Sequence, residues 1–237
     1  MMEEPFALGA RLSACAGMVR EGRVLADIGT DHAYLPIWLV RTGKIPRAFA
    51  SDINEEPIQL AKEHIRRYGI ADKITAFTAD GMEKIPPDEV DDIVIAGMGG
   101  DNIAGILEGA PWLLSPRYRL ILQPMSKAER LRAYLYSRQF FVLEEKPICE
   151  ANRIYTVICA EYSPEPFHYS DFDIYAGRLD KRNPYAAALL QRQAGILRDM
   201  ADGCAVRHDE EGEKNFRALA EQLLRWRLAI LGDCKSK

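Results

Sequence analysis

Apolar segments of strand length alternate with amphipathic segments through the first two thirds of the chain. The strand-length segments are 24–26, 48–51, 74–78, 92–96 and 120–122, and helical spacing of apolar residues appears at 33–41, 55–68, 103–109 and 127–138. The run Asp92–Ala96 is almost continuously apolar, as expected for a strand that is covered on both faces. The alternation predicts parallel strands joined by helices, which is the arrangement of a Rossmann-like α/β domain.

Two segments at the ends of this region complete the predicted domain. Residues 8–19 place apolar side chains at helical spacing, with Arg11 and Arg20 towards the polar side of the predicted helix. The last two predicted strands, 140–145 and 154–161, are separated by too few residues for a parallel crossover, which needs about a dozen. They should therefore form an antiparallel hairpin, and the sheet should contain seven strands that are mostly parallel.

Strand patterns stop after Tyr162, where a connector rich in proline and aromatic residues begins. Beyond it, Tyr185–Met200 and Asn215–Leu231 are long amphipathic segments, which predict an antiparallel helical hairpin or coiled coil. Asp202-Gly203 and the charged run 209–212 should separate the two helices. We therefore expect two domains, 1–165 with the Rossmann-like sheet and 166–237 with the helical hairpin.

Composition narrows the class of protein. Hydrophobic residues make up 48% and charged residues 28%, the net charge is −4, and no apolar run approaches the roughly 18 residues of a membrane helix. The start, MMEEPFALG, lacks the basic region and apolar core of a signal peptide. The five cysteines are scattered and form no CxxC pair, so we expect reduced thiols, no metal site and a cytoplasmic location.

The stretch Val24–Pro36, VLADIGTDHAYLP, joins the first strand to the next helix through a glycine-bearing turn. In open α/β sheets the ligand lies beyond the carboxyl end of such a strand. Carboxylates beside the amides at a helix start compete with an anion for that place, so Asp27 and Asp31 disfavour a phosphate ligand.

Polar or flexible residues also follow the next three strands, at Asp52, Asp80-Gly81 and Gly97–Gly100. Parallel strands end at the same edge of a sheet, so these residues should meet the first turn there. Asp52 stands 23 residues after Gly29, close to the offset of about 20 at which an acid binds ribose hydroxyls. Asp80, one strand further out, suits an adenine amino group.

This set of acids favours S-adenosylmethionine as the cofactor. The GxGxxG spacing of dinucleotide sites is absent, S-adenosylmethionine has no pyrophosphate, and its sulfonium and ammonium groups are cationic. Two alternatives stay open. One is an NAD-binding Rossmann oxidoreductase, and the other is a non-catalytic adaptor that senses S-adenosylmethionine and binds a protein partner through the helical hairpin.

In their order along the chain, DIGTDHAYLP, SDIN, ADG, IAGMGG and ILQP resemble the motifs of the bacterial TrmK family. The resemblance spans roughly residues 8–161, and the helical hairpin matches the coiled-coil domain of that family. It implies a class I methyltransferase that uses S-adenosylmethionine to methylate N1 of an adenine, at position 22, in the D-arm region of tRNA. Met125 departs from the pattern, because an Asn is expected after Gln123-Pro124.

The strand ends and the resemblance together define the expected site. Cofactor contacts are expected from Asp27, Gly29, Thr30, Asp52, Ile53, Asp80, Gly81, Gly97, Met98 and Gly99. Substrate contacts are expected from Gly100, Gln123, Pro124 and Arg130. We expect Asp31 to stabilise positive charge or orient the adenine amino group, with His32 assisting, since methylation of N1 produces a cation.

Each of these roles has a structural alternative. Asp27 would contact the methionine ammonium or only hydrogen-bond within the turn, and Asp31 would act on the base or only cap the following helix. Asp52 would bind ribose or cap the next helix. The basic residues Lys127, Arg130, Arg132 and Arg138 would form a solvated helix face or contact phosphates. We further expect that the protein binds tRNA and does not associate with a membrane. We expect it to be a monomer or a weak homodimer.

Overall fold

Seven strands form one sheet in the computed structural model, which describes residues 6–233. The spatial order is β3-β2-β1-β4-β5-β7-β6, with β1 to β5 parallel and β7 antiparallel to both of its neighbours. This confirms the predicted mostly parallel sheet with a hairpin at one edge. The strands are β1 Leu25–Ile28, β2 Ala48–Asp52, β3 Ile74–Thr78, β4 Asp92–Gly99, β5 Arg119–Ser126, β6 Phe140–Glu150 and β7 Arg153–Tyr162.

Helices cover both faces of the sheet. They are α1 Ala10–Met18, α2 Tyr34–Arg41, α3 Glu55–Arg67, α4 Gly100–Glu108 and α5 Ala128–Ser137, with the short 3₁₀ turns η1 Pro87–Glu89 and η2 Pro111–Leu113. Successive residues of a strand point to opposite faces, so Val94 packs with Leu39 and the α1–α3 side. Its neighbours Ile93 and Ile95 pack with Leu131 and the α4–α5 side. The unbroken apolar run in β4 thus reflects a strand that is buried on both faces.

The hairpin of β6 and β7 is longer than the pattern predicts. The loop expected over 147–152 is reduced to Ala151 and Asn152, both with positive φ, and strand pairing continues through Glu150 and Arg153. Pro147 therefore lies inside β6, where it pairs with Thr156. Proline is tolerated there because β6 is the edge strand of the sheet.

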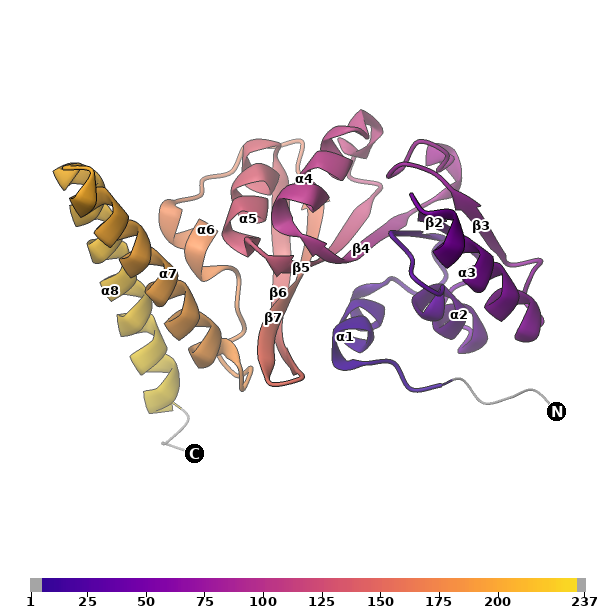
Figure 1. The fold of residues 1–237 in the computed structure, drawn as a ribbon, viewed down its shortest axis with the longest axis horizontal. Helices are drawn as coiled ribbons and strands as arrows, with labels where there is room; N and C mark the ends of the chain where they lie inside the picture. Colours follow the sequence, from indigo (N-terminus) through magenta and orange to yellow (C-terminus); the bar gives the residue numbers. More distant parts are fainter. Residues whose placement is uncertain (1–5, 234–237) are drawn as a thin grey trace.

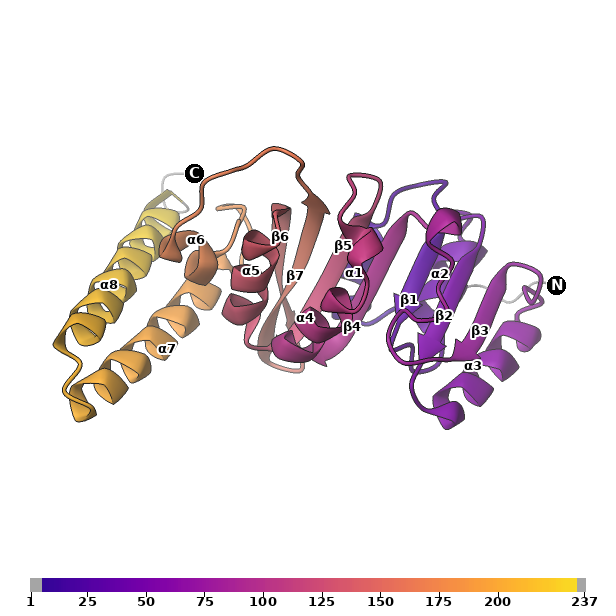
Figure 2. The same ribbon diagram turned by 90° about the horizontal axis from the view of Figure 1, so that it is seen from above.

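Three helices follow the sheet at one end of the molecule, while α3 and β3 lie at the other (Figures 1 and 2). These are α6 Asp171–Ala176, which the pattern did not predict, α7 Ala186–Val206 and α8 Glu210–Asp233. The predicted break at Asp202-Gly203 is wrong, because both residues lie inside α7. Ala201 and Cys204 continue the buried stripe there, and Asp202 forms an ion pair with Arg217 of α8.

The helical hairpin has its own hydrophobic core, which is separate from the two cores of the sheet. Leu190, Ala194 and Leu197 of α7 meet Leu223 and Ile230 of α8 in this core. A tight turn at 207–209 joins the helices, so the antiparallel hairpin that the sequence predicts is present with longer arms.

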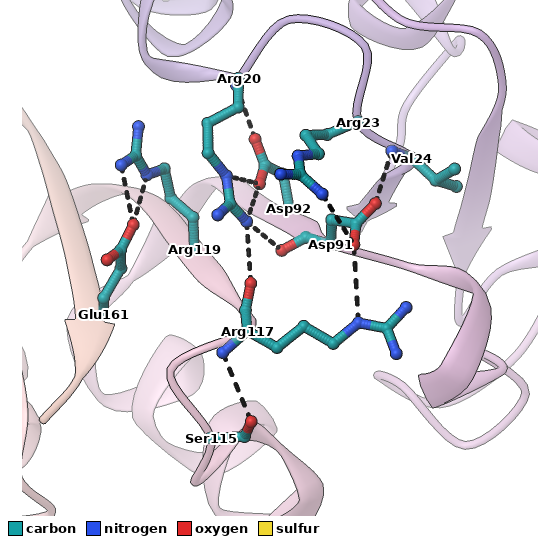
Figure 3. Close-up of polar contacts among 9 residues, drawn as sticks. All are labelled: Arg20, Arg23, Val24, Asp91, Asp92, Ser115, Arg117, Arg119 and Glu161. Atoms are coloured by element: carbon teal, nitrogen blue, oxygen red, sulfur yellow. Dashed lines mark hydrogen bonds and ion pairs between the residues drawn. The ribbon is translucent and has the colours of Figure 1, made fainter. Parts of the chain in front are cut away.

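At the edge of the sheet opposite the strand ends discussed above, arginines and carboxylates are closely paired (Figure 3). Arg20 donates to the buried carboxylate of Asp92 from its backbone N and from Nε, at 2.7 Å each. It also donates through Nη2 to the carbonyl oxygens of Asp91 and Arg117, at 2.9 Å each. Arg119 pairs with Glu161 across β5 and β7. This network ties the chain that enters β1 to the starts of β4 and β5.

A second ion pair joins the sheet to the C-terminal helices. Arg132 of α5 and Glu145 of β6 are both buried and form two hydrogen bonds, of 2.8 and 2.9 Å. Arg132 also donates to the carbonyl of Ile174, and the N–H of Arg178 donates to Glu145. Arg132 is therefore no part of a solvated basic face, and that alternative in the sequence analysis is wrong for this residue. The pair fixes the segment between α6 and α7 against β6.

This buried pair leads to a stability prediction. Replacing one partner leaves the other charge buried and unpaired, so Arg132→Met and Glu145→Gln should each lower the free energy of unfolding by about 3–5 kcal/mol. The double variant should lose clearly less than the sum of the two single losses, because no orphaned charge remains. Urea unfolding of the four proteins measures this. Strictly additive losses would show that the two side chains do not act as a pair.

Candidate active site

The carboxyl ends of β1, β2, β3 and β4 border two neighbouring recesses. The first has a volume of about 560 Å³ and lies between the ends of β2 and β3 and helix α4, while the second, of about 480 Å³, lies between α1, the turn after β1 and the end of β4. Gly29 and Asp52 line both recesses. The strand-end residues that the sequence singles out are thus brought together at one edge.

Eleven of the sixteen expected site residues line these recesses. Ile53, Asp80, Gly81 and Met98 line the first, and Asp27, Thr30, Asp31, His32 and Gly97 line the second, with Gly29 and Asp52 shared. Gly99, Gly100, Gln123, Pro124 and Arg130 are not among the lining residues.

The turn after β1 needs glycine at position 29. Gly29 has a φ of +73°, and a Cβ atom there would lie 2.0 Å from Cε of Met98. The N–H groups of Gly29 and Thr30 donate to the carbonyl of Ser51, at 2.8 and 2.9 Å, which fastens the turn to β2. The turn after β1 is therefore in direct contact with Met98 of β4, and Gly29 itself lines both recesses.

Asp27 is a buried carboxylate at the end of β1. Its one described side-chain hydrogen bond comes from the hydroxyl of Thr30, at 2.6 Å. Burial raises the pKa of Asp27 to about 6, and the Thr30 hydrogen bond opposes this only in part. A buried carboxylate without a charged partner is costly, so this position suits a cationic ligand group.

Asp52 lies at the junction of the two recesses and is held by the chain that follows it. Its Oδ1 atom accepts from the backbone N of Asn54 at 2.8 Å and from Nδ2 of Asn54 at 3.2 Å. Asn54 is the N-cap residue of α3, but its side chain makes no capping hydrogen bond. The carboxylate is thus oriented at the rim, as hydrogen bonding to a pair of hydroxyls requires.

Asp31 and His32 stand on the rim of the second recess. His32 Nε2 lies 3.2 Å from Oδ2 of Asp31, whose side chain is 78% exposed. Helix α2 begins after Ala33, which has a φ of +55°, and no side chain caps it, so Asp31 is not its cap. His64 of α3 lies with Nδ1 at 3.1 Å from the carbonyl oxygen of His32. The Asp31 carboxylate is therefore free to meet a substrate.

The glycines at the end of β4 allow close backbone packing in addition to leaving space for a ligand. Gly100 is buried, and a Cβ there would lie 2.3 Å from the carbonyl oxygen of Lys127, while Gly99 faces Ser126. Helix α4 begins at Gly100, three residues earlier than predicted. These two glycines allow α4 to approach the turn between β5 and α5.

Arg11 is a site residue that the sequence analysis missed. Its Nη1 donates to Oε1 of Gln123 at 3.2 Å, its side chain forms an ion pair with Glu150, and it lines the second recess. Gln123 is fully buried and also accepts from the N–H of Gly97 at 3.1 Å. The partners of Arg11 lie more than a hundred residues away, so periodicity places it only on the polar side of α1.

The remaining predicted substrate residues lie around the recesses. Pro124 is buried, Met125 is partly exposed and its sulfur lies 3.3 Å from Nη1 of Arg11. Arg130 is exposed and pairs with Asp101 of α4 at 3.1 Å. Met125 thus contacts the arginine of the site directly, although the family pattern suggests Asn at this position.

The described part of the chain, residues 6–233, contains neither a cluster of metal ligands nor a helix that could span a membrane. No group of three or more His, Cys, Asp or Glu side chains in this range could hold a metal ion. No helix in the same range is long and apolar enough to cross a membrane. Cys15, Cys149, Cys159 and Cys204 are free thiols, and Cys234 lies outside the described residues.

Comparison with known proteins identifies the family. Residues 8–158 match the model of the methyltransferase domain. The tRNA (adenine(22)-N(1))-methyltransferase of Bacillus subtilis is 38% identical over 172 residues, which cover 73% of this chain and 72% of that protein. The chain belongs to the TrmK family.

Solved structures agree with the TrmK-family assignment over nearly the whole chain. A putative tRNA (m1A22) methyltransferase of Streptococcus pneumoniae has a TM-score of 0.80 and 30% identity, covering 92% of this chain and 100% of that one. Its complex with S-adenosyl-L-methionine has a TM-score of 0.77 and 32% identity, covering 90% and 98%. B. subtilis TrmK has a TM-score of 0.77 and 28% identity, covering 92% and 99%. The similarity therefore includes the helical hairpin.

Proposed function

We propose that this chain is an S-adenosylmethionine-dependent methyltransferase that methylates N1 of adenine 22 in tRNA and produces 1-methyladenosine. The observation that carries the proposal is a pair of carboxylates in one recess. Asp27 is buried without a charged partner, and Asp52 is oriented by hydrogen bonds from Asn54. Both lie at the edge where open α/β sheets bind their ligands. The B. subtilis relative bears the name of this activity.

The two recesses suit the two ends of S-adenosylmethionine. In the second recess, Asp27, oriented by Thr30, would pair with the methionine ammonium, and Arg11 would pair with the carboxylate. Gly29 and Gly97, both with positive φ, leave the backbone accessible between them. This half of the cofactor would thus contact one anionic side chain, Asp27, and one cationic side chain, Arg11.

At the junction and in the first recess, Asp52 would accept hydrogen bonds from both ribose hydroxyls. Asp80 and Gly81 would meet the adenine edge, while Ile53, which is 62% exposed, and Met98 would cover its faces. An exposed isoleucine at the mouth of a recess is well suited to pack against a flat ring. When bound, the cofactor supplies an electrophilic methyl group on a cationic sulfonium.

Catalysis requires placement and charge stabilisation more than a strong base. Adenine N1 carries an in-plane lone pair, so the site must hold it in line with the methyl group. We assign Asp31 to stabilising the positive charge that develops on the base or to accepting from its amino group. His32, 3.2 Å from Asp31, would hold that carboxylate in place.

Four of the five expected site residues outside the recess linings would act indirectly, and the fifth, Arg130, would contact the tRNA. Gln123 joins Arg11 to the N–H of Gly97 and would position both, and Pro124 and the packed glycines Gly99 and Gly100 would shape the rim. Arg130 would exchange its ion pair with Asp101 for a tRNA phosphate. An exposed ion pair contributes little to stability, so this exchange costs little.

The C-terminal helices would form a separate domain that contacts the body of the tRNA. Their independent core supports a division into 1–165 and 166–237. The charges of residues 171–237, 12 basic and 11 acidic, are nearly balanced, so any phosphate contacts must come from a local stripe of arginines. We further propose a cytoplasmic enzyme that is a monomer or a weak homodimer.

The two alternative functions are less well supported. An NAD-dependent oxidoreductase needs a place for a pyrophosphate, whereas this turn presents Asp27 and Asp31 beside Gly29. A non-catalytic adaptor would not need an exposed Asp31 at the mouth of a formed cofactor site. The names of the relatives likewise favour a methyltransferase.

Methylation of bulk tRNA tests the proposed function. The purified protein with labelled S-adenosylmethionine should transfer methyl groups to tRNA that lacks the modification, and nucleoside mass spectrometry should find 1-methyladenosine. Asp31→Ala should bind S-adenosylhomocysteine with unchanged affinity and lose at least about a hundredfold in single-turnover rate, as removal of one preorganised electrostatic group does.

The outcomes of this assay are separable. Absence of labelled 1-methyladenosine with the wild-type protein would overturn the function. Full single-turnover activity of Asp31→Ala would overturn only the role given to Asp31.

The pKa of Asp27 predicts how cofactor affinity changes with pH. The ammonium pairs with the ionised carboxylate, and the free protein ionises Asp27 only above a pKa of about 6. The affinity for S-adenosylhomocysteine should therefore change little between about pH 6.5 and about pH 7.5, and fall about fivefold between roughly pH 6 and roughly pH 5. Asp27→Asn should bind more weakly and lose this dependence. Calorimetric titrations that show the same slope for both proteins would contradict the assignment.

A further inference from the structure

An aromatic recess lies beside the candidate active site and has no part in the functions assigned above. Its volume is about 360 Å³, within the range of roughly 300–1,000 Å³ that is common for small-molecule sites. It shares Leu12 and Tyr34 with the second recess. Its lining consists of Phe6, Ala7, Leu8, Gly9, Leu12, Tyr34 and Tyr68.

Three rings shape this aromatic recess, and each is held by neighbours. Phe6 meets Tyr34 edge-on at 5.0 Å between ring centroids and Tyr68 at 5.8 Å. Tyr34 also stacks on His64 at 5.3 Å, with 23° between the ring planes. Tyr34 nevertheless remains 40% exposed. Rigid rings that stay partly exposed lose little conformational entropy when a flat ligand stacks on them.

A guanidinium stands at the border of the aromatic recess. The seven described residues that line the recess are uncharged. Arg41 lies against it, with its guanidinium carbon 5.6 Å from the centroid of the Tyr68 ring and Nη1 3.4 Å from the Tyr68 carbonyl oxygen. A recess whose described lining is uncharged and includes three aromatic rings matches a nucleobase.

We propose that the aromatic recess binds the base of a nucleotide adjacent to the target adenine. The inference rests on the proposed function and names a further part of the substrate. Drawing an adenine into the site breaks its stacking with its neighbours, which costs free energy. An aromatic platform that is continuous with the active site, through Leu12 and Tyr34, restores stacking for one neighbour.

Variants of Tyr68 test the stacking surface without altering residues of the first two recesses. Tyr68→Leu removes the ring and should lower kcat/KM for a tRNA transcript roughly tenfold, as expected for the loss of one base–aromatic stack. Tyr68→Phe keeps the ring and should retain most of the activity. Affinity for S-adenosylhomocysteine and the thermal midpoint should match the wild type. Tyr169→Leu, which removes a tyrosine ring that also packs against another ring, that of Tyr136, outside the aromatic recess, is the matched control and should leave kcat/KM unchanged.

A double-mutant cycle, which combines a protein variant with a modified RNA, decides whether a base occupies the aromatic recess. Transcripts with an abasic nucleotide immediately before or immediately after the target adenine are assayed with wild type and Tyr68→Leu. At one of the two positions, the abasic change should lower kcat/KM of the wild type roughly tenfold. At the same position it should cause no further loss of kcat/KM in Tyr68→Leu. Phe6→Leu serves as a second variant if Tyr68→Leu fails to fold.

The results separate the two levels of inference. Additive losses at both neighbouring positions would overturn the proposed base site, even if methylation proceeds normally. Equal losses of Tyr68→Leu and Tyr68→Phe would also overturn it, since stacking needs only the ring. Absence of methylation with every RNA would instead overturn the proposed function itself.

Discussion

The buried carboxylate of Asp27 is the constraint on which the site depends. It ends β1 inside the protein, accepts one hydrogen bond from Thr30, and its pKa is raised to about 6 by burial. A folded chain keeps such a group only if another interaction offsets the cost. The turn around it is fastened to β2 through Ser51 and requires Gly29 against Met98. A bound cation would complete this arrangement.

The two edges of the sheet differ in whether their charged side chains are paired. At the amino edge, Arg20 and its neighbours pair with Asp91 and Asp92 and fix the starts of the central strands (Figure 3). At the carboxyl edge, Asp27 and Asp31 lack a lysine or arginine partner among the described residues. The edge with the recesses thus keeps carboxylates without such a partner, whereas the amino edge is stabilised by paired charges.

The pattern of apolar and polar residues predicted the sheet, its hairpin and most of the residues that line the recesses. This was possible because the carboxyl ends of parallel strands meet at one edge of a sheet, however the helices pack. The tertiary contacts of Arg11, Gln123 and Arg132 escaped prediction for a different reason, although Gln123 itself was expected at the site. These contacts join elements that local pattern does not connect, as Glu150 does for Arg11 and Ile174 for Arg132. The predicted break at Asp202-Gly203 was wrong because the buried stripe of α7 continues through Ala201 and Cys204, and this packing outweighs the local turn preference.

The central claim is that this edge recognises a cofactor with a cation and no pyrophosphate. Calorimetric titration of the wild-type protein with S-adenosylmethionine, S-adenosylhomocysteine and NAD tests it most directly. We expect saturable binding of the first two at one site per chain and no saturable binding of NAD. Saturable binding of NAD, or failure of both sulfur-containing compounds to bind, would contradict it.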